Sequence, residues 1–329
     1  MCGRYASARK RIELLEEFSV ERDRTTQPLA PDYNVAPTKS VYAVLTRDGR
    51  DSRDWRDSRD SPDSPDSRDS RDSRDGQDGG DEEQPHPARQ LRVVRWGLVP
   101  SWAKDISIGS RLINARSETV AEKPAFRRAF ARRRCLLPAD GYYEWMVLGA
   151  TEASDRPGKK AKQPYFIHRA DGGPLAFAGL YELWRDKSVP DDDPAAWLWS
   201  ATIITTTAPD ELGEIHDRMP MVIPPDSWAD WLDPANTDVA DLRALLAPAM
   251  TSGLATYPVS TEVNSVRNNG PQLLEQIEVN QSIHRVAPLR SPSSGSPAPQ
   301  GAPEPRVRGS DASTASPPPA ESGTGAALP

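Results

Sequence analysis

Short stretches dominated by apolar, β-branched and aromatic residues recur along most of the chain, and Pro and Gly bound many of them. This pattern is typical of β-strands, because such residues pack well on a pleated, half-buried surface. The pattern predicts eight strands, at Val41–Thr46, Leu91–Gly97, Cys135–Pro138, Tyr165–Arg169, Leu175–Tyr181, Leu198–Thr206, Met221–Ile223 and Ala255–Val259.

Four segments predict helices instead. In the first of them, Ile12, Leu15 and Phe18 would lie near one face of a helix. Strands outnumber helices and do not alternate regularly with them, which favours an α+β fold with a largely antiparallel, barrel-like sheet and short flanking helices. The predicted helices are Ala8–Phe18, Pro124–Arg132, Asp226–Leu232 and Asp238–Leu246.

A polar repeat interrupts this pattern. From Arg47 to Glu82 the chain repeats tripeptides such as RDS, with Asp at every third position from Asp48 to Asp81. A period of three fits neither helix nor strand, and such a segment cannot bury apolar area, so we expect a disordered loop over 47–90. The repeat could bind a partner or be phosphorylated. An expanded repeat tolerated at a loop tip is the favoured interpretation, because loop length costs little free energy.

The end of the chain has its own composition. Residues 288–329 are rich in Pro, Ser, Ala and Gly, which predicts a disordered tail. The folded domain is then expected over 2–287, interrupted by the repeat. This length is sufficient for one domain with a proper core.

The net charge of −7 is concentrated in the repeat. Residues 47–90 hold nine Arg and fourteen Asp or Glu, a net charge of −5, so the remainder of the chain is near neutral. Phosphate is bound by a local patch of charge rather than by the sum. The acidic total therefore does not exclude a basic groove for nucleic acid.

Cysteine and histidine usage narrows the possible chemistry. The two cysteines, Cys2 and Cys135, exclude a disulfide framework, and with the four scattered histidines they form no zinc-binding cluster, so no metal or cofactor is expected. Cys135 lies in an apolar strand and is expected to be an inert core thiol. The chain has no apolar run of transmembrane length and no signal-peptide block, which predicts a cytosolic protein without a membrane partner.

Candidate chemistry begins at Met1-Cys2-Gly3. Cys2 is small enough for Met1 to be removed, which would leave a free α-amine with a pKa of about 8 beside a nucleophilic thiol. An amine attacks an aldehyde to give an imine, and the neighbouring thiol can then close a five-membered thiazolidine. This second step is intramolecular and gains from proximity.

Six further motifs follow in a fixed order, and with MCGRYA at the start they resemble the SRAP family, the SOS-response-associated peptidases that process abasic sites. The resemblance covers nearly all of the expected folded part, while the repeat and the tail lie outside it. It implies a single α+β domain with a curved antiparallel sheet and a positively charged groove for single-stranded DNA. The motifs are YNVAPT (33–38), WGLVPSW (96–102), INARSET (113–119), CLLPADGYYEW (135–145), IHDRMP (215–220) and VNSVRNN (263–269).

The resemblance also implies a role for each matched residue. Cys2 would form the crosslink, and Asn114 would position its amine or adduct. Glu144 would act as acid and base on the opened deoxyribose, and His216 would shuttle protons nearby. The expected DNA-binding residues are Arg4, Asn34, Trp96, Trp102, Arg116 and Arg218.

Elementary chemistry agrees with these roles. Glu144 stands among Tyr142, Tyr143 and Trp145, whose bulk would desolvate the carboxyl group and raise its pKa. His216 would titrate near neutrality. Arg side chains match phosphate oxygens, and exposed Trp rings stack on unpaired bases. Without the other motifs, Glu144 would be assigned to a surface ion pair, and Trp102 could equally be a core residue.

Two other classes of protein stay open on the residues alone. N-terminal-nucleophile amidotransferases also begin Met-Cys-Gly, although their HTR-type motif is absent here. In a non-enzymatic module for single-stranded DNA, Cys2 would be incidental. The family name also leaves open a peptidase activity, either limited to removal of Met1 or extending to other peptide bonds. We expect a monomer with a crosslinking, lyase-like activity on abasic single-stranded DNA, associated with the nucleoid when bound to damage.

Overall fold

The computed structural model describes residues 2–47, 86–148, 161–190, 193–246 and 253–279. The predicted disordered tail, and the predicted loop except for its two ends, lie outside the described residues.

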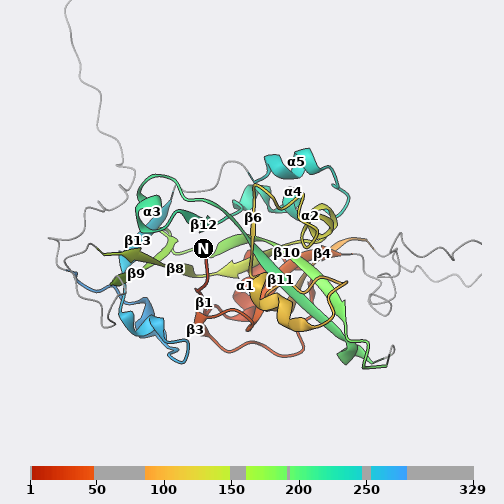
Figure 1. The fold of residues 1–329 in the computed structure, drawn as a ribbon, viewed down its shortest axis with the longest axis horizontal. Helices are drawn as coiled ribbons and strands as arrows, with labels where there is room; N and C mark the ends of the chain where they lie inside the picture. Colours follow the sequence, from red (N-terminus) through yellow and green to blue (C-terminus); the bar gives the residue numbers. More distant parts are fainter. Residues whose placement is uncertain (1, 48–85, 149–160, 191–192, 247–252, 280–329) are drawn as a thin grey trace, which may run out of the picture. The chain divides into compact units, whose positions relative to one another are not determined.

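Five strands close into a barrel at the centre of the described fold (Figure 1). Their order is β11–β10–β7–β4–β5, and β5 pairs in turn with β11. All contacts in this ring are antiparallel except the parallel pairing of β5 with β11. The predicted α+β domain with a largely antiparallel, barrel-like sheet is therefore confirmed. The five strands are β4 (Ser40–Arg47), β5 (Ala88–Trp96), β7 (Arg134–Ala139), β10 (Leu175–Arg185) and β11 (Trp197–Thr207).

A second sheet of five strands carries the beginning of the chain. Its order is β13–β9–β8–β1–β3, and all its pairings are antiparallel. Only Asp140 separates β7 of the barrel from β8 of this sheet, so the chain passes directly from one sheet to the other. The strands are β1 (Tyr5–Ser7), β3 (Asp32–Val35), β8 (Gly141–Val147), β9 (Lys162–Arg169) and β13 (Leu254–Pro258).

Three short strands add to the barrel sheet. β2 (Arg22–Asp23) pairs with β5. β6 (Asn114–Arg116) pairs in parallel with β11, and β12 (Arg218–Pro220) pairs antiparallel with it. Three of the candidate site residues, Asn114, Arg116 and Arg218, therefore lie at the ends of short strands that pair with the same end of β11.

Short helices flank the sheets, as expected. α1 (Arg11–Glu17), α2 (Arg127–Arg132), α4 (Trp228–Leu232) and α5 (Val239–Ala244) fall inside the predicted ranges. Only α3 (Asp210–Ile215) was not predicted. The 3-10 helices are η2 (Ile106–Arg111), η3 (Pro194–Ala196), η4 (Pro225–Ser227), η5 (Thr261–Asn264) and η6 (Pro271–Leu274). Among the described residues, no helix has the length and apolar character needed to cross a membrane.

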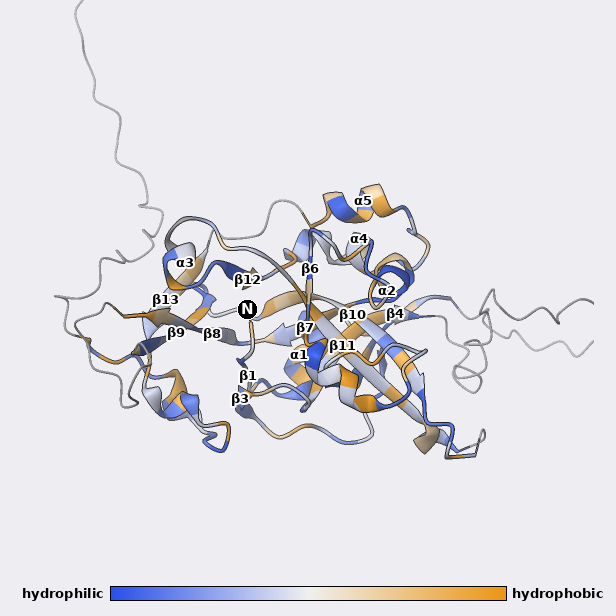
Figure 2. Ribbon diagram, in the orientation of Figure 1, coloured by the Kyte–Doolittle hydropathy of each residue, from blue (hydrophilic) through white to orange (hydrophobic). Residues whose placement is uncertain are grey.

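Apolar side chains fill the spaces between these elements. In Figure 2, α5 shows both hydrophobic and hydrophilic turns, in keeping with a buried Leu242 on an otherwise exposed helix. Inside the molecule, the Tyr5 ring meets Trp96 edge to face with centroids 5.1 Å apart, and it meets Phe177 at 5.7 Å.

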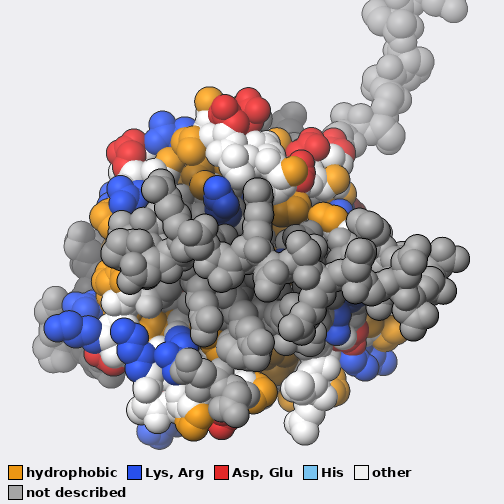
Figure 3. Space-filling view, turned by 90° about the vertical axis from the view of Figure 1, so that its right-hand side faces the viewer, with side chains coloured by type: hydrophobic (Ala, Val, Ile, Leu, Met, Phe, Trp, Pro, Cys, Tyr) orange, Lys and Arg blue, Asp and Glu red, His pale blue; other side chains and the backbone are white. Residues whose placement is uncertain are grey.

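Lys and Arg side chains gather along one edge of the face shown in Figure 3.

Two predicted boundaries were wrong. β5 begins at Ala88, so residues 88–90 belong to a strand and not to the loop: Ala88 and Gln90 are fully buried while Arg89 is half-buried, an alternation hidden by the polar composition. The predicted strand Met221–Ile223 lies just after β12. There the chain crosses from β11 to β10. The backbone N–H of Met221 donates to Ile204 O of β11, and the backbone N–H of Ile223 donates to Ala176 O of β10.

Candidate active site

The register of β1 and β8 carries the residues before Tyr5 along Tyr143 and Glu144. Tyr5 pairs with Tyr142, and the backbone N–H of Tyr143 donates to Arg4 O at 3.0 Å. Because the strands are antiparallel, each step back along β1 is a step forward along β8. The beginning of the chain lies among β1, β8 and β12 (Figure 1).

Cys2 is fully buried in this conformation. Burial raises the pKa of the Cys2 thiol well above its ordinary value, and the negative charge of Glu144 raises it further. The thiol is therefore held protonated at neutral pH, which makes it a weak first nucleophile.

Asn114 is joined to Cys2 by a hydrogen bond. Its Nδ2 donates to Cys2 O at 2.7 Å, whereas its Oδ1 is buried and has no hydrogen-bond partner among the described residues. The position of Asn114 is set by β6, in which it pairs with Ile203 of β11. Trp96 fixes the preceding residue, because its Nε1 donates to Ile113 O at 3.0 Å. Asn114 thus presents one unused acceptor close to the backbone of Cys2.

Glu144 lies within β8 and is 4% exposed. Burial raises the pKa of Glu144 from 4.5 to about 7. Both protonation states are then populated near neutral pH, which is the condition for efficient general acid–base catalysis.

His216 directly follows α3, and its ring is held by the backbone. The N–H of Arg218 donates to His216 Nδ1 at 3.0 Å. The Asp217 carboxylate lies 2.9 Å from the same nitrogen, a contact that requires a hydrogen on Nδ1. Burial lowers the pKa of His216, and the Asp217 side chain is 85% exposed, where an ion pair contributes little. We therefore assign the neutral ring with Nδ1 as the acceptor.

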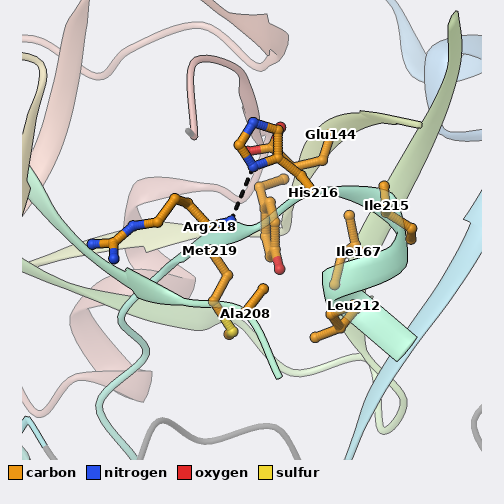
Figure 4. A pocket seen from close by; sticks show the side chains of 9 residues that line it. Glu144, Ile167, Ala208, Leu212, Ile215, His216, Arg218 and Met219 are labelled. Carbon is orange, nitrogen blue, oxygen red and sulfur yellow. Dashed lines mark hydrogen bonds between the residues drawn. The ribbon is translucent and has the colours of Figure 1, made fainter. Parts of the chain in front are cut away.

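Glu144 and His216 line one small pocket of about 180 Å³. Figure 4 shows the two side chains at the same end of it, with Arg218 beside them. The opposite end is apolar. Its remaining lining residues are Tyr142, Ile167, Ala208, Leu212, Ile215 and Met219.

Arg4 and Asn34 have structural contacts. Arg4 Nη1 donates to Asn34 Oδ1 at 2.7 Å and to Val263 O at 2.8 Å. Asn34 is fully buried, and its Nδ2 donates to the carbonyl oxygens of Ser265 and Asn268 at 2.9 Å each. Contact between Asn34 and DNA is therefore excluded in this conformation, contrary to the prediction. The YNVAPT motif instead ties β3 to the VNSVRNN segment.

The two tryptophans of the WGLVPSW motif differ in exposure. Trp96 is fully buried, so the prediction that a base stacks on it does not fit its position. Gly97, which follows it, has a φ of 122°, and a Cβ there would lie 2.5 Å from Gly109 O, so this turn requires glycine. Trp102 is 59% exposed, which leaves its ring open to solvent and consistent with stacking.

Arg116 and Arg218 also differ. The Arg116 side chain is exposed, and it makes no hydrogen bond or ion pair with the described residues. Arg218 is 11% exposed and pairs with Glu118. Of these two cations, only Arg116 is presented to solvent without an acidic partner.

The structure thus gathers Cys2, Asn114, Glu144 and His216, and it separates Asn34 and Trp96 from any surface. It also adds two residues. Tyr142 was noted in the sequence only as an apolar neighbour of Glu144, yet it lines the pocket. Glu118 was not predicted as a site residue. The signal that could have found it is its place as an acidic residue in the INARSET motif, whose Arg116 was expected to bind phosphate. In the described ranges, no group of three or more His, Cys, Asp or Glu could hold a metal ion.

A cysteine beside an amide and a carboxyl–imidazole pair defines a site for nucleophilic chemistry with proton transfer. The model of the family described as SOS response associated peptidase (SRAP) matches residues 1–266. The chain therefore belongs to the SRAP family.

Several known proteins align with more than half of this chain. The chain is 34% identical over 275 residues to abasic site processing protein YoqW of Bacillus subtilis (strain 168), covering 84% of this chain and 99% of that protein. It is 34% identical over 214 residues to abasic site processing protein HMCES of Gallus gallus, covering 58% of this chain and 59% of that one. A crystal structure of a Bacteroides thetaiotaomicron protein has the same fold, with a TM-score of 0.59 at 21% identity, covering 84% of this chain and 100% of that one.

Proposed function

We propose that this protein processes abasic sites in single-stranded DNA by forming a thiazolidine between Cys2 and the ring-opened sugar aldehyde. The names of YoqW and HMCES support the substrate class. The observation that carries the chemistry is the meeting of Cys2, Asn114, Glu144 and His216, which come from four separate segments.

Removal of Met1 comes first in this mechanism. While Met1 is attached, the nitrogen of Cys2 is an amide and cannot form an imine. Once it is a free amine, the buried and unused Oδ1 of Asn114 is suited to accept a hydrogen bond from it, while Nδ2 holds Cys2 O. Release of Met1 is the only peptide hydrolysis that the proposal requires.

Glu144 prepares the sugar. Opening the ring of an abasic deoxyribose moves a proton from the C1 hydroxyl to the ring oxygen. A carboxyl group with a pKa of about 7 can accept the proton of the C1 hydroxyl and donate a proton to the ring oxygen. The neutral imidazole of His216, at the same end of the pocket, can exchange protons with this group.

Crosslinking then takes two steps. The amine attacks the aldehyde carbon, and one water leaves as the C=N bond forms. The thiol adds across this bond: sulfur joins the carbon, and the thiol proton ends on nitrogen. Because burial keeps the Cys2 thiol protonated, the amine acts first and the thiol closes the ring. The abasic aldehyde is thereby shielded from other reactions.

The neighbouring surface supports a single-stranded substrate. Arg116 stands in the same strand as Asn114, Trp102 belongs to the preceding WGLVPSW motif, and both side chains are exposed. A ring that can stack on an unpaired base, together with a cation that can bind phosphate, is the usual combination in single-strand binding.

The test uses three oligonucleotides of one sequence: abasic single-stranded, intact single-stranded, and abasic with its complement. The proposal predicts a denaturation-resistant product with the first, none with the second, and slower formation with the third. Equal binding of the first two without a covalent product would support a plain binding module. Glutamine hydrolysis without crosslinking would support an amidotransferase.

A further inference from the structure

Arg218 has no terminal N–H left for DNA. Its Nη1 donates to Glu118 Oε1 at 2.5 Å and to Thr207 Oγ1 at 3.4 Å. Its Nη2 donates to Glu118 Oε2 at 3.0 Å and to Thr205 O at 2.6 Å. The remaining donor, Nε, is buried without a partner in the described part of the chain. A phosphate can use this guanidinium group only by replacing the Glu118 carboxylate.

The strands hold the two side chains face to face. Arg116 of β6 pairs with Thr205 of β11, and Arg218 of β12 pairs with Thr207. Glu118 stands two residues beyond β6, so the ion pair crosses over β11 beside the candidate active site. The Glu118 carboxylate is 48% exposed, whereas Arg218 is 11% exposed. The carboxylate can therefore move into solvent while the guanidinium group stays in place.

We propose that Glu118 is an intramolecular substitute for a DNA phosphate, which occupies Arg218 and lowers the affinity of the protein for intact single-stranded DNA. The inference rests on the proposed function in one respect, that the ligand is single-stranded DNA. A bidentate carboxylate matches the arginine fork in the same way as two phosphate oxygens do. Retention at a site then depends on covalent capture rather than on affinity.

Counterions give this competition a measurable signature. When Arg218 neutralises a phosphate, the DNA releases bound cations, and each contact on a single strand changes the slope of log K against log salt by about 0.7. A displaced Glu118 leaves its negative charge beside the bound phosphate, so Arg218 and Glu118 together neutralise little of the phosphate charge and release few cations. With Glu118 neutral, the full slope should appear.

The experiment compares affinities for an intact single-stranded oligonucleotide at several salt concentrations. We expect Glu118→Gln to tighten binding about three- to tenfold at low salt and to steepen the slope by about 0.7. The matched control is Glu122→Gln. Glu122 pairs with Arg243 at 2.9 Å, and both side chains are largely exposed, so this variant makes the same charge change away from Arg218 and should not alter the slope.

A merely supporting role for Glu118 gives the opposite result. Weaker or unchanged binding by Glu118→Gln, with thermal unfolding like that of the wild type, would overturn the proposal. Tighter binding by Glu118→Gln that persists in the double variant with Arg218→Ala would also overturn the proposal. Glu118→Asp, which keeps the charge but is too short for both nitrogens, should show a smaller gain and serves if the Gln variant is unstable. Crosslinking of abasic DNA by the wild type is scored separately, so a failure of the proposed function is distinguishable.

Discussion

Replacing Glu144 with Gln should separate the stability of the fold from its chemistry. Folding raises the pKa of Glu144 from 4.5 to about 7, and each pKa unit corresponds to about 1.36 kcal/mol. A group with a raised pKa contributes stability that is complete below its unfolded pKa and is lost as the pH rises through its folded pKa. The ionised carboxylate therefore lowers the free energy of unfolding by about 3 kcal/mol above pH 7, and Glu144→Gln avoids this loss.

Denaturant unfolding at pH 5 and pH 8 measures this difference directly. The two proteins should differ by less than about 1 kcal/mol at pH 5, where the carboxyl group of the folded wild type is mostly protonated. At pH 8 the variant should be the more stable by about 3 kcal/mol. Its single-turnover crosslinking rate should nevertheless fall about tenfold or more, the scale of a lost acid–base group. A stability difference that is identical at the two pH values would refute the argument from burial.

Three further changes have clear expectations. Cys2→Ala should abolish the covalent product on a denaturing gel and keep the affinity for intact single-stranded DNA; a stable crosslink at full yield would exclude the thiazolidine. Arg116→Ala should weaken binding to all sequences and flatten the salt slope by about 0.7 in affinity titrations, and an unchanged slope would exclude a phosphate contact. Replacing residues 48–87 with Asn-Gly should preserve the melting temperature and crosslinking, because Arg47 pairs with Ala88 and a two-residue turn can close that hairpin; loss of crosslinking in a folded protein would place the repeat in the site.

The fold could be predicted from the sequence where the strands are long and apolar. All five barrel strands overlap a predicted strand, because each holds enough apolar residues to show a pattern; in β7 these are Cys135, Leu136 and Leu137, without any β-branched or aromatic residue. β1, β3 and β6 have three or four residues each, too few for a period, and their pairing with neighbouring strands defines them. β8 was missed for another reason. Its aromatic residues were interpreted as surroundings of Glu144 and not as a strand.

The site shows a similar division. The motifs led to Cys2, Asn114, Glu144 and His216, which the structure brings together. A motif does not reveal which way a side chain faces, so the burial of Asn34 and Trp96 could not be foreseen. The pairing of Glu118 with Arg218 joins residues 100 positions apart and depends on two strands that flank β11. Such a contact becomes visible only when the sheet order is known.

The most direct test of the central claim is the mass and position of the adduct. Protein whose loss of Met1 has been verified is incubated with an abasic single-stranded oligonucleotide, digested, and sequenced by tandem mass spectrometry. The account predicts one modified peptide, beginning at Cys2, that carries the sugar remnant less one water and survives without reductant. An adduct on any other residue, or one that persists only after borohydride reduction, would contradict it.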